Sequence, residues 1–170
     1  IQALFISLLD YGSALYFGMA DYLFSRLQTI QNFAARMSCN LPSGSSASPI
    51  LKFLHWLLAR KRATFTLLCD MHHALYTASP HYLWKRDFFY RPARARRTAN
   101  MAIIAMRRIH NARMGSRSFT HIAAVLWNAL PLNLLLTTNL TLFKKLLKTR
   151  LSQANLHWPA THPVSFKHTF

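Results

Sequence analysis

Residues 60–76 read RKRATFTLLCDMHHALY, and this stretch decides the fold class. Its apolar side chains recur at intervals of three and four residues, the spacing that gathers side chains on one face of an α-helix. The stretch therefore predicts a helix with one buried face, formed by Phe65, Leu68, Cys69, His72 and Leu75.

The remainder of the chain carries further helix signals, separated by segments rich in Pro, Gly and Ser. Asn40–Ser48 contains Pro42, Gly44 and four serines, which is typical of a loop. Ser-Pro pairs predict helix starts, with Ser at the N-cap and Pro in the first turn. We expect helices over residues 1–18, Asp21–Met37, a short stretch from Ser48-Pro49, a short turn or helix over Ser79–Trp84, His121–Asn128 and Thr141–Leu151.

The first two expected helices differ in their patterning. Residues 1–18 should form a largely buried helix. Its apolar positions are Leu4, Ile6, Leu8, Leu9 and Leu15, Gly12 weakens its middle, and Gly18 is its expected end. Asp21 should cap the second helix, which is amphipathic. Its apolar face consists of Leu23, Leu27, Ile30 and Ala34, and its polar face of Arg26, Gln28, Gln31, Asn32 and Arg36.

The C-terminal half adds a basic segment, a small β-hairpin and two helices. Met101–Met106 is the best strand candidate, and Arg117–Thr120 is its expected partner. In the last helix, Lys144, Lys145 and Lys148 should face solvent, and Leu142, Phe143, Leu146, Leu147 and Leu151 should face inward. We predict a mainly α protein divided into residues 1–84, residues 85–151 and a disordered tail at 152–170.

The charge balance indicates a polyanionic partner. The chain holds 21 Lys and Arg against 4 acidic residues, for a net charge of +17, and it contains no Glu. The four Asp are spread along the sequence, which excludes a glycosidase pair, an aspartic dyad or a two-metal carboxylate site. The excess of positive charge favours nucleic acid over an anionic membrane surface, because the basic clusters do not lie opposite one sustained apolar face.

The densest positive charge lies in Lys85–Arg117, where ten Lys and Arg accompany one Asp. Aromatic residues interleave with the arginines, which favours contact with RNA or DNA, since Arg both binds phosphate and stacks on bases. A solvated linker or a nuclear-import patch is the alternative interpretation. A second cluster of positive charge, Arg60-Lys61-Arg62, lies at the start of the helix expected over residues 60–76. These side chains would either contact phosphate or form a solvated first turn. The candidate nucleic-acid-binding residues are Arg60, Lys61, Arg62, Trp84, Arg91, Arg94, Arg96 and Arg97.

The sequence contains no motif typical of metal binding, redox chemistry or nucleophilic catalysis. Cys39 and Cys69 belong to no CxxC motif, and His72 and His73 are adjacent, so they point in different directions on a helix. Ser116 and Ser118 have no nucleophile elbow or triad acid. We therefore predict no catalytic residue, metal site or cofactor. Trp127 and Trp56, in aliphatic surroundings, should be core residues, whereas Trp84 should be more exposed.

The order of several short motifs resembles the C-terminal region of reverse transcriptases from LINE-type (non-LTR) retrotransposons, from near the thumb to beyond it. The resemblance covers about residues 1–151, and its specificity comes from the order and spacing of the motifs. They are Ser7–Leu15 (SLLDYGSAL), Leu27–Arg36 (LQTIQNFAAR), Leu54–Leu57 (LHWL) with Arg60 and Arg62, Leu75-Tyr76, Ser79–Leu83 (SPHYL), Gly115, Phe119, Leu126–Pro131 (LWNALP) and Phe143–Lys148.

The resemblance implies a helical, thumb-like bundle in residues 1–84. It also implies a non-catalytic part of an RNA-directed DNA polymerase that binds template-primer or element RNA, with the palm and fingers of the parent protein as partners. The family's catalytic (F/Y)xDD motif is not in this sequence, and the chain opens on Ile rather than Met, as expected of a fragment. Such a protein would work inside the cell, in nucleus and cytoplasm. Leu58 and Ala124 stand where the family usually has Pro, which leaves open a decayed remnant that acts as a structural or interaction module.

Overall fold

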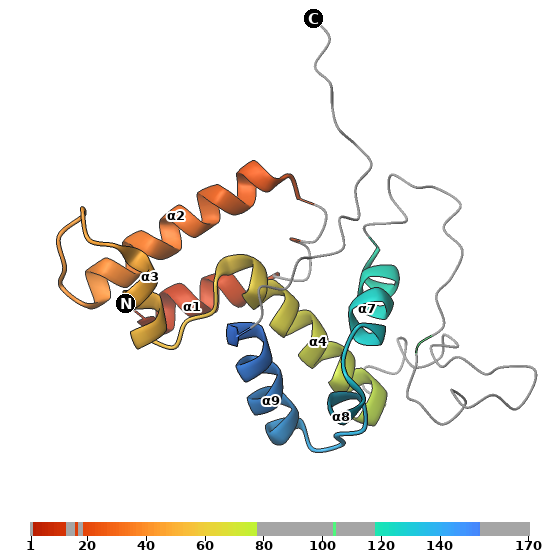
Figure 1. The fold of residues 1–170 in the computed structure, drawn as a ribbon. Coiled ribbons are helices and arrows are strands. Elements are labelled where there is room, and N and C mark those ends of the chain that lie inside the picture. The colour runs from red at the N-terminus through yellow and green to blue at the C-terminus, as the bar shows by residue number, and fades with distance from the viewer. Residues whose placement is uncertain (1, 13–15, 17–18, 78–103, 105–117, 154–170) are drawn as a thin grey trace, which may run out of the picture.

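The computed structural model describes residues 2–12, 16, 19–77, 104 and 118–153, and this part of the chain is mainly helical, as the sequence predicted (Figure 1). The helix expected at residues 60–76 is confirmed as the longest described element. In chain order the helices are α1 (Gln2–Asp10), α2 (Asp21–Ser38), α3 (Ala47–Phe53), α4 (Ala59–Thr77), α7 (Phe119–Asn128), α8 (Leu132–Leu135) and α9 (Leu140–Gln153).

The main core forms around α4, against which α7 and α9 pack (Figure 1). Trp127 of α7 and Phe143 of α9 are fully enclosed, and their ring centroids lie 5.8 Å apart. Leu67 and Leu68 meet them from α4. The expected domain division at residues 84 and 85 lies outside the described residues, but helices from both sides of it share this core.

A second, smaller core joins α2 to α3. It consists of Ala34, Ala35, Ile50, Leu51 and Trp56, and the Trp56 ring stacks on Phe5 of α1 at 6.0 Å between centroids. The burial expected for both Trp56 and Trp127 is therefore confirmed.

Two left-handed residues end α2 and α3 with the same turn. Asn40 and His55 have φ angles of 56° and 53°. In each case the next amide reaches back to the last helical turn, as when the Trp56 N–H donates to the Leu51 carbonyl oxygen at 2.8 Å. This is the Schellman pattern, in which the residue after the left-handed one packs on the helix it has just left. The turn at His55 thereby directs Trp56 into the small core.

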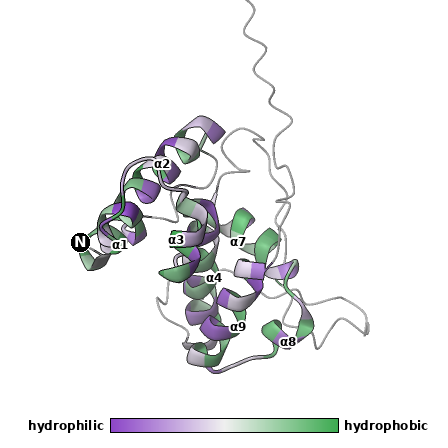
Figure 2. Ribbon diagram, turned by 60° about the vertical axis from the view of Figure 1, so that its left-hand side comes forward, coloured by the Kyte–Doolittle hydropathy of each residue, from purple (hydrophilic) through white to green (hydrophobic). Residues whose placement is uncertain are grey.

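The inward face of α2 differs from the expected one. Gln31 is buried, and its side-chain amide donates to the Leu57 carbonyl oxygen at 2.8 Å, while the Gln28 side chain accepts from the Ala59 N–H at 3.0 Å. Ile30, expected inside, is exposed. The non-helical connection between α3 and α4 has peptide groups that need partners, and the two glutamines supply them. Figure 2 shows hydrophilic and hydrophobic residues alternating along α2.

The first helix is shorter and more exposed than expected. It ends at Asp10, because the chain turns at Gly12, where φ is 67°. Leu4 and Leu8 are 68% and 64% exposed, so the prediction that both are buried is wrong. They lie four residues apart on one face, whereas Leu9, one residue further, is buried.

Two expected caps are misplaced. Asp21 is the first residue of α2 rather than its N-cap, which is Ala20. Ser46, not Ser48, is the N-cap of α3. Pro49 nevertheless lies in the first turn of α3, where a missing N–H costs no helical hydrogen bond.

The described C-terminal part corrects three expectations. Phe119 and Thr120 open α7 and are not in a strand, since Ser118 takes an extended conformation and the apolar run after it continues as a helix. Met101–Met106 lies outside the described residues except for Ile104. In α9, Leu142 and Leu146 are exposed, because the buried stripe repeats every four residues at Phe143, Leu147 and Leu151. Residues 152 and 153 belong to α9, and the rest of the expected tail lies outside the described residues.

Candidate nucleic-acid interface

Arg60, in the first turn of α4, forms an ion pair with Asp21 at the start of α2. Its guanidinium carbon also lies 4.6 Å from the centre of the Phe24 ring. The Arg60 and Asp21 side chains are 44% and 88% exposed. Exposed pairs of this kind contribute at most about 1 kcal/mol, so the contact positions Arg60 more than it stabilises the fold.

Arg62 is bound more tightly. It donates from Nε and a terminal nitrogen to the two oxygens of Asp10, each at 2.6 Å, and its side chain is 18% exposed. This bidentate geometry is the strong form of an arginine–carboxylate contact. Arg60 thus joins α2 to α4, and Arg62 joins α1 to α4. A phosphate group bound by either arginine would have to compete with the Asp carboxylate that already holds it.

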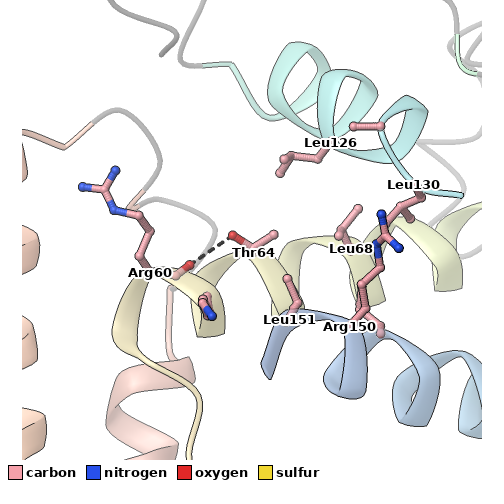
Figure 3. Close-up of a pocket in the computed structure, with 10 residues that line it drawn as sticks. Arg60, Thr64, Leu68, Leu126, Leu130, Arg150 and Leu151 are labelled. Carbon is pink, nitrogen blue, oxygen red and sulfur yellow. Dashed lines mark hydrogen bonds between the residues drawn. The ribbon is translucent and has the colours of Figure 1, made fainter. Parts of the chain in front are cut away.

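Lys61 lies at a pocket that sequence reasoning did not foresee. The pocket is formed by α4, α7, α9 and the residues after α7, and it encloses about 90 Å³ (Figure 3). Arg150, which the sequence did not single out, lies at the same pocket. Ninety positions separate Arg150 from Arg60, and only the packing of α9 on α4 brings them to one site. The lining residues are Arg60, Lys61, Thr64, Leu68, Leu126, Ala129, Leu130, Leu147, Arg150 and Leu151.

The lysines of α9 face solvent, as the sequence predicted. Burial raises the pKa of the Asp70 carboxyl and of the Cys69 thiol in α4, and the positive charge of Lys144 opposes this rise at both groups without cancelling it. The net effect raises the pKa of Cys69 to about 12, so this thiol is protonated at neutral pH and is a poor nucleophile.

His72 is a core residue rather than a ligand. It is buried in contact with Tyr76 and Phe143, and its Nε2 lies 2.8 Å from the Thr137 carbonyl oxygen. Burial lowers the pKa of its imidazole. Within the described ranges, no three His, Cys, Asp or Glu side chains gather in a way that would hold a metal ion.

Asn128 bonds to a different partner from the one expected. The LWNALP motif predicts that it turns back to the local backbone before Pro131. Instead its side-chain amide exchanges two 3.0 Å hydrogen bonds with the N–H and carbonyl oxygen of Ile104. The Asn128 amide thus makes the same pair of hydrogen bonds with the Ile104 backbone that a neighbouring β-strand would make. The side chain of Ile104 is buried in the main core.

The other candidate nucleic-acid residues, Trp84, Arg91, Arg94, Arg96 and Arg97, lie outside the described residues. Among the helices that the structure describes, none is long and apolar enough to cross a membrane. A scan against protein-family models and searches of curated proteins and solved structures found no match to this chain.

Proposed function

We propose that this chain binds the phosphate backbone of RNA or DNA without catalysing a reaction, as a C-terminal part of a retrotransposon reverse transcriptase. The observation that carries the proposal is the internal use of Asp10 and Asp21, two of the four acidic residues, by Arg62 and Arg60. Only two Asp remain to oppose all the other Lys and Arg. An excess of this size attracts polyanions by releasing their counterions.

The main contact in this proposal is Lys85–Arg117, centred on Arg94, Arg96 and Arg97. Ten of the 21 Lys and Arg lie in it, beside Tyr82, Trp84 and Tyr90. Arginine beside aromatic residues binds single strands by combining phosphate contacts with base stacking. Met101–Met106 remains our candidate strand within this segment. The start of α4 contributes less than the sequence predicted, because two of its three cations already bind carboxylates.

Salt-dependent binding of a labelled single-stranded RNA by the full chain tests the proposal. The logarithm of the association constant should fall by about 0.7 per phosphate contact for each tenfold rise in salt. Replacing Arg94, Arg96 and Arg97 by Gln should lower affinity for all sequences alike and flatten this slope by up to about 2.

Replacing Lys144, Lys145 and Lys148 by Gln is the matched control, since it removes the same charge from an exposed helix face. This variant should keep more of the affinity and slope. An equal loss in both variants would mean diffuse attraction to net charge, and no measurable binding by the unmodified chain would refute the proposed function.

A second candidate function is an interaction module without a nucleic-acid role. The observation that favours it is the exposed apolar surface of α1 and α2, where Leu4, Leu8, Ile30 and Phe33 are all more than half exposed. Exposed apolar surface of this kind is typical of contact with another protein. The two triple variants separate the two functions, because an interaction module would show at most diffuse attraction to net charge, which both variants would weaken equally.

A further inference from the structure

The pocket between α4, α7 and α9 has an apolar floor. Leu68, Leu126, Leu147 and Leu151 line it and are all buried (Figure 3). The hydroxyl of Thr64 donates to the Arg60 carbonyl oxygen at 3.0 Å, so the only hydroxyl in the lining is already engaged. An apolar cavity of about 150 Å³ holds one benzene molecule. A pocket of about 90 Å³ is smaller than this, so it has room for one aliphatic side chain of about the size of Leu and not for an aromatic ring.

All three charged residues at this pocket are cations. Arg60 and Lys61 come from the first turn of α4, and Arg150 comes from the last turn of α9, where Figure 3 shows its side chain beside Leu130. Arg60 is partly neutralised by Asp21, whereas the side chain of Arg150 is exposed and has no hydrogen bond or ion pair among the described residues. The positive end of the α4 dipole adds to the charge at the Lys61 side.

Lining chemistry distinguishes between possible ligands. A nucleobase in this pocket would lose water from its hydrogen-bonding edge and find only aliphatic carbon, which is costly. A fatty acid suits the floor but brings one carboxylate to cations that come from two helices. An acidic peptide supplies both a hydrocarbon side chain for the floor and carboxylates on either side of it.

We propose that this pocket binds an acidic peptide segment of a partner protein, with one Leu-sized apolar side chain inserted between α4, α7 and α9 and flanking carboxylates on Arg150 and Lys61. This inference does not depend on the proposed nucleic-acid function, whose main contact lies in Lys85–Arg117. The apolar side chain supplies affinity, and the carboxylates supply selectivity for acidic partners.

The test is fluorescence anisotropy of the full chain with a short labelled peptide that has a central Leu flanked by Glu on both sides. Ala129→Phe should reduce affinity by about tenfold or more, because the new ring would cover the mouth of the pocket. Ala129 is exposed, and its backbone, at φ −82° and ψ −5°, accepts any side chain, so the variant should fold, as circular dichroism would verify. Arg150→Gln should weaken binding by about three- to tenfold.

Lys148→Gln is the matched control, since it removes the same charge from α9 at a residue that does not line the pocket. It should change affinity less than about twofold, an effect typical of a distant surface charge. Peptides with Gln for Glu, or with Ser for Leu, should both bind more weakly than the parent peptide.

Three results would overturn the proposal. Full binding by the Ala129→Phe variant would place the peptide elsewhere, and equal losses in Arg150→Gln and Lys148→Gln would indicate net charge alone. Displacement of the peptide by decanoate, or by single-stranded RNA whose own binding is lost in Ala129→Phe, would assign the pocket to a fatty acid or to nucleic acid. RNA binding that survives Ala129→Phe would leave the proposed function intact whatever the peptide does.

Discussion

The core around α4 and the smaller core between α2 and α3 are built from different side chains. The first encloses the rings of Trp127 and Phe143 completely. The second is smaller, and of its buried residues Ala34, Ala35, Ile50, Leu51 and Trp56 only Ala35 is completely enclosed. Because the stabilisation from burial scales with apolar area, the first core contributes much more free energy than the second.

The N-terminal helices compensate for their small core with polar contacts to α4 and the connection before it. Gln28 and Gln31 bond to the backbone at Ala59 and Leu57, and Arg62 holds Asp10 of α1. Helix α4 therefore serves two purposes: its middle is part of a hydrophobic core, whereas its start anchors two helices by hydrogen bonds and charge. The two ends should therefore respond to different perturbations.

The largest expected effect is the loss of the Trp127 ring. Trp127→Ala should lower the free energy of unfolding by about 3–5 kcal/mol, since it removes a fully buried ring that stacks on Phe143. Trp56→Ala should cost less, because the smaller core is less tightly enclosed. Urea denaturation followed by circular dichroism measures both, with Trp84→Ala as the control expected to keep its stability. Equal losses for Trp127 and Trp56 would contradict the difference between the two cores.

A smaller effect should follow the loss of the contact between α1 and α4. Arg62→Gln should lower the free energy of unfolding by about 1–2 kcal/mol, because it leaves the Asp10 carboxylate without its bidentate partner. Arg60→Gln is the matched control in the same helical turn, and it should cost less than about 0.5 kcal/mol because its pair is exposed. A double-mutant cycle with Asp10→Asn gives the coupling energy, and additive single losses would show that the pair does not join the helices.

Sequence periodicity predicted the parts of the fold that large apolar side chains determine. The helix at residues 60–76 follows from spacing, and the burial of Trp127 follows from its aliphatic neighbours. In α9 the inward positions of Phe143 and Leu147 were predicted, but Leu142 and Leu146 were wrongly placed inside with them. Periodicity failed for α2. Gln31 faces inward because its side chain bonds to the carbonyl oxygen of Leu57, and the local sequence pattern does not reveal a contact with so distant a residue. It also missed Arg150, because a pocket between distant helices depends on how α4 and α9 pack.

The main core should also be sensitive to acid through His72. Its Nε2 donates to the Thr137 carbonyl oxygen, and its Nδ1 has no hydrogen-bond partner within the described ranges, so protonation would place an unsatisfied N–H among aromatic rings. Because burial lowers the pKa of His72 below the unfolded value of about 6.5, the unfolded chain takes up protons first as the pH falls.

Stability should therefore be complete above about pH 6.5 and decrease below it, until the pH reaches the lower pKa of the folded state. The slope contributed by this one proton cannot exceed about 1.4 kcal/mol per pH unit. Thermal unfolding between neutral and mildly acidic pH should show this loss in the unmodified chain and in His73→Gln, a control at an exposed neighbour. His72→Phe should lose this contribution, and an unchanged pH profile in that variant would assign the acid sensitivity to another group.

The smallest expected effect concerns the exposed apolar face of α2. Phe33 is 56% exposed, so Phe33→Ser should change the free energy of unfolding by no more than about 0.5 kcal/mol. Phe24 lies on the same helix but is buried, and Phe24→Ser should cost several times as much. Urea denaturation of both variants of the full chain compares the two faces directly. If Phe33→Ser were as costly as Phe24→Ser, the outer face of α2 would be covered by another part of the protein or by a second copy. The N-terminal helices would then have a hydrophobic core of their own, and their dependence on polar contacts with α4 would no longer follow.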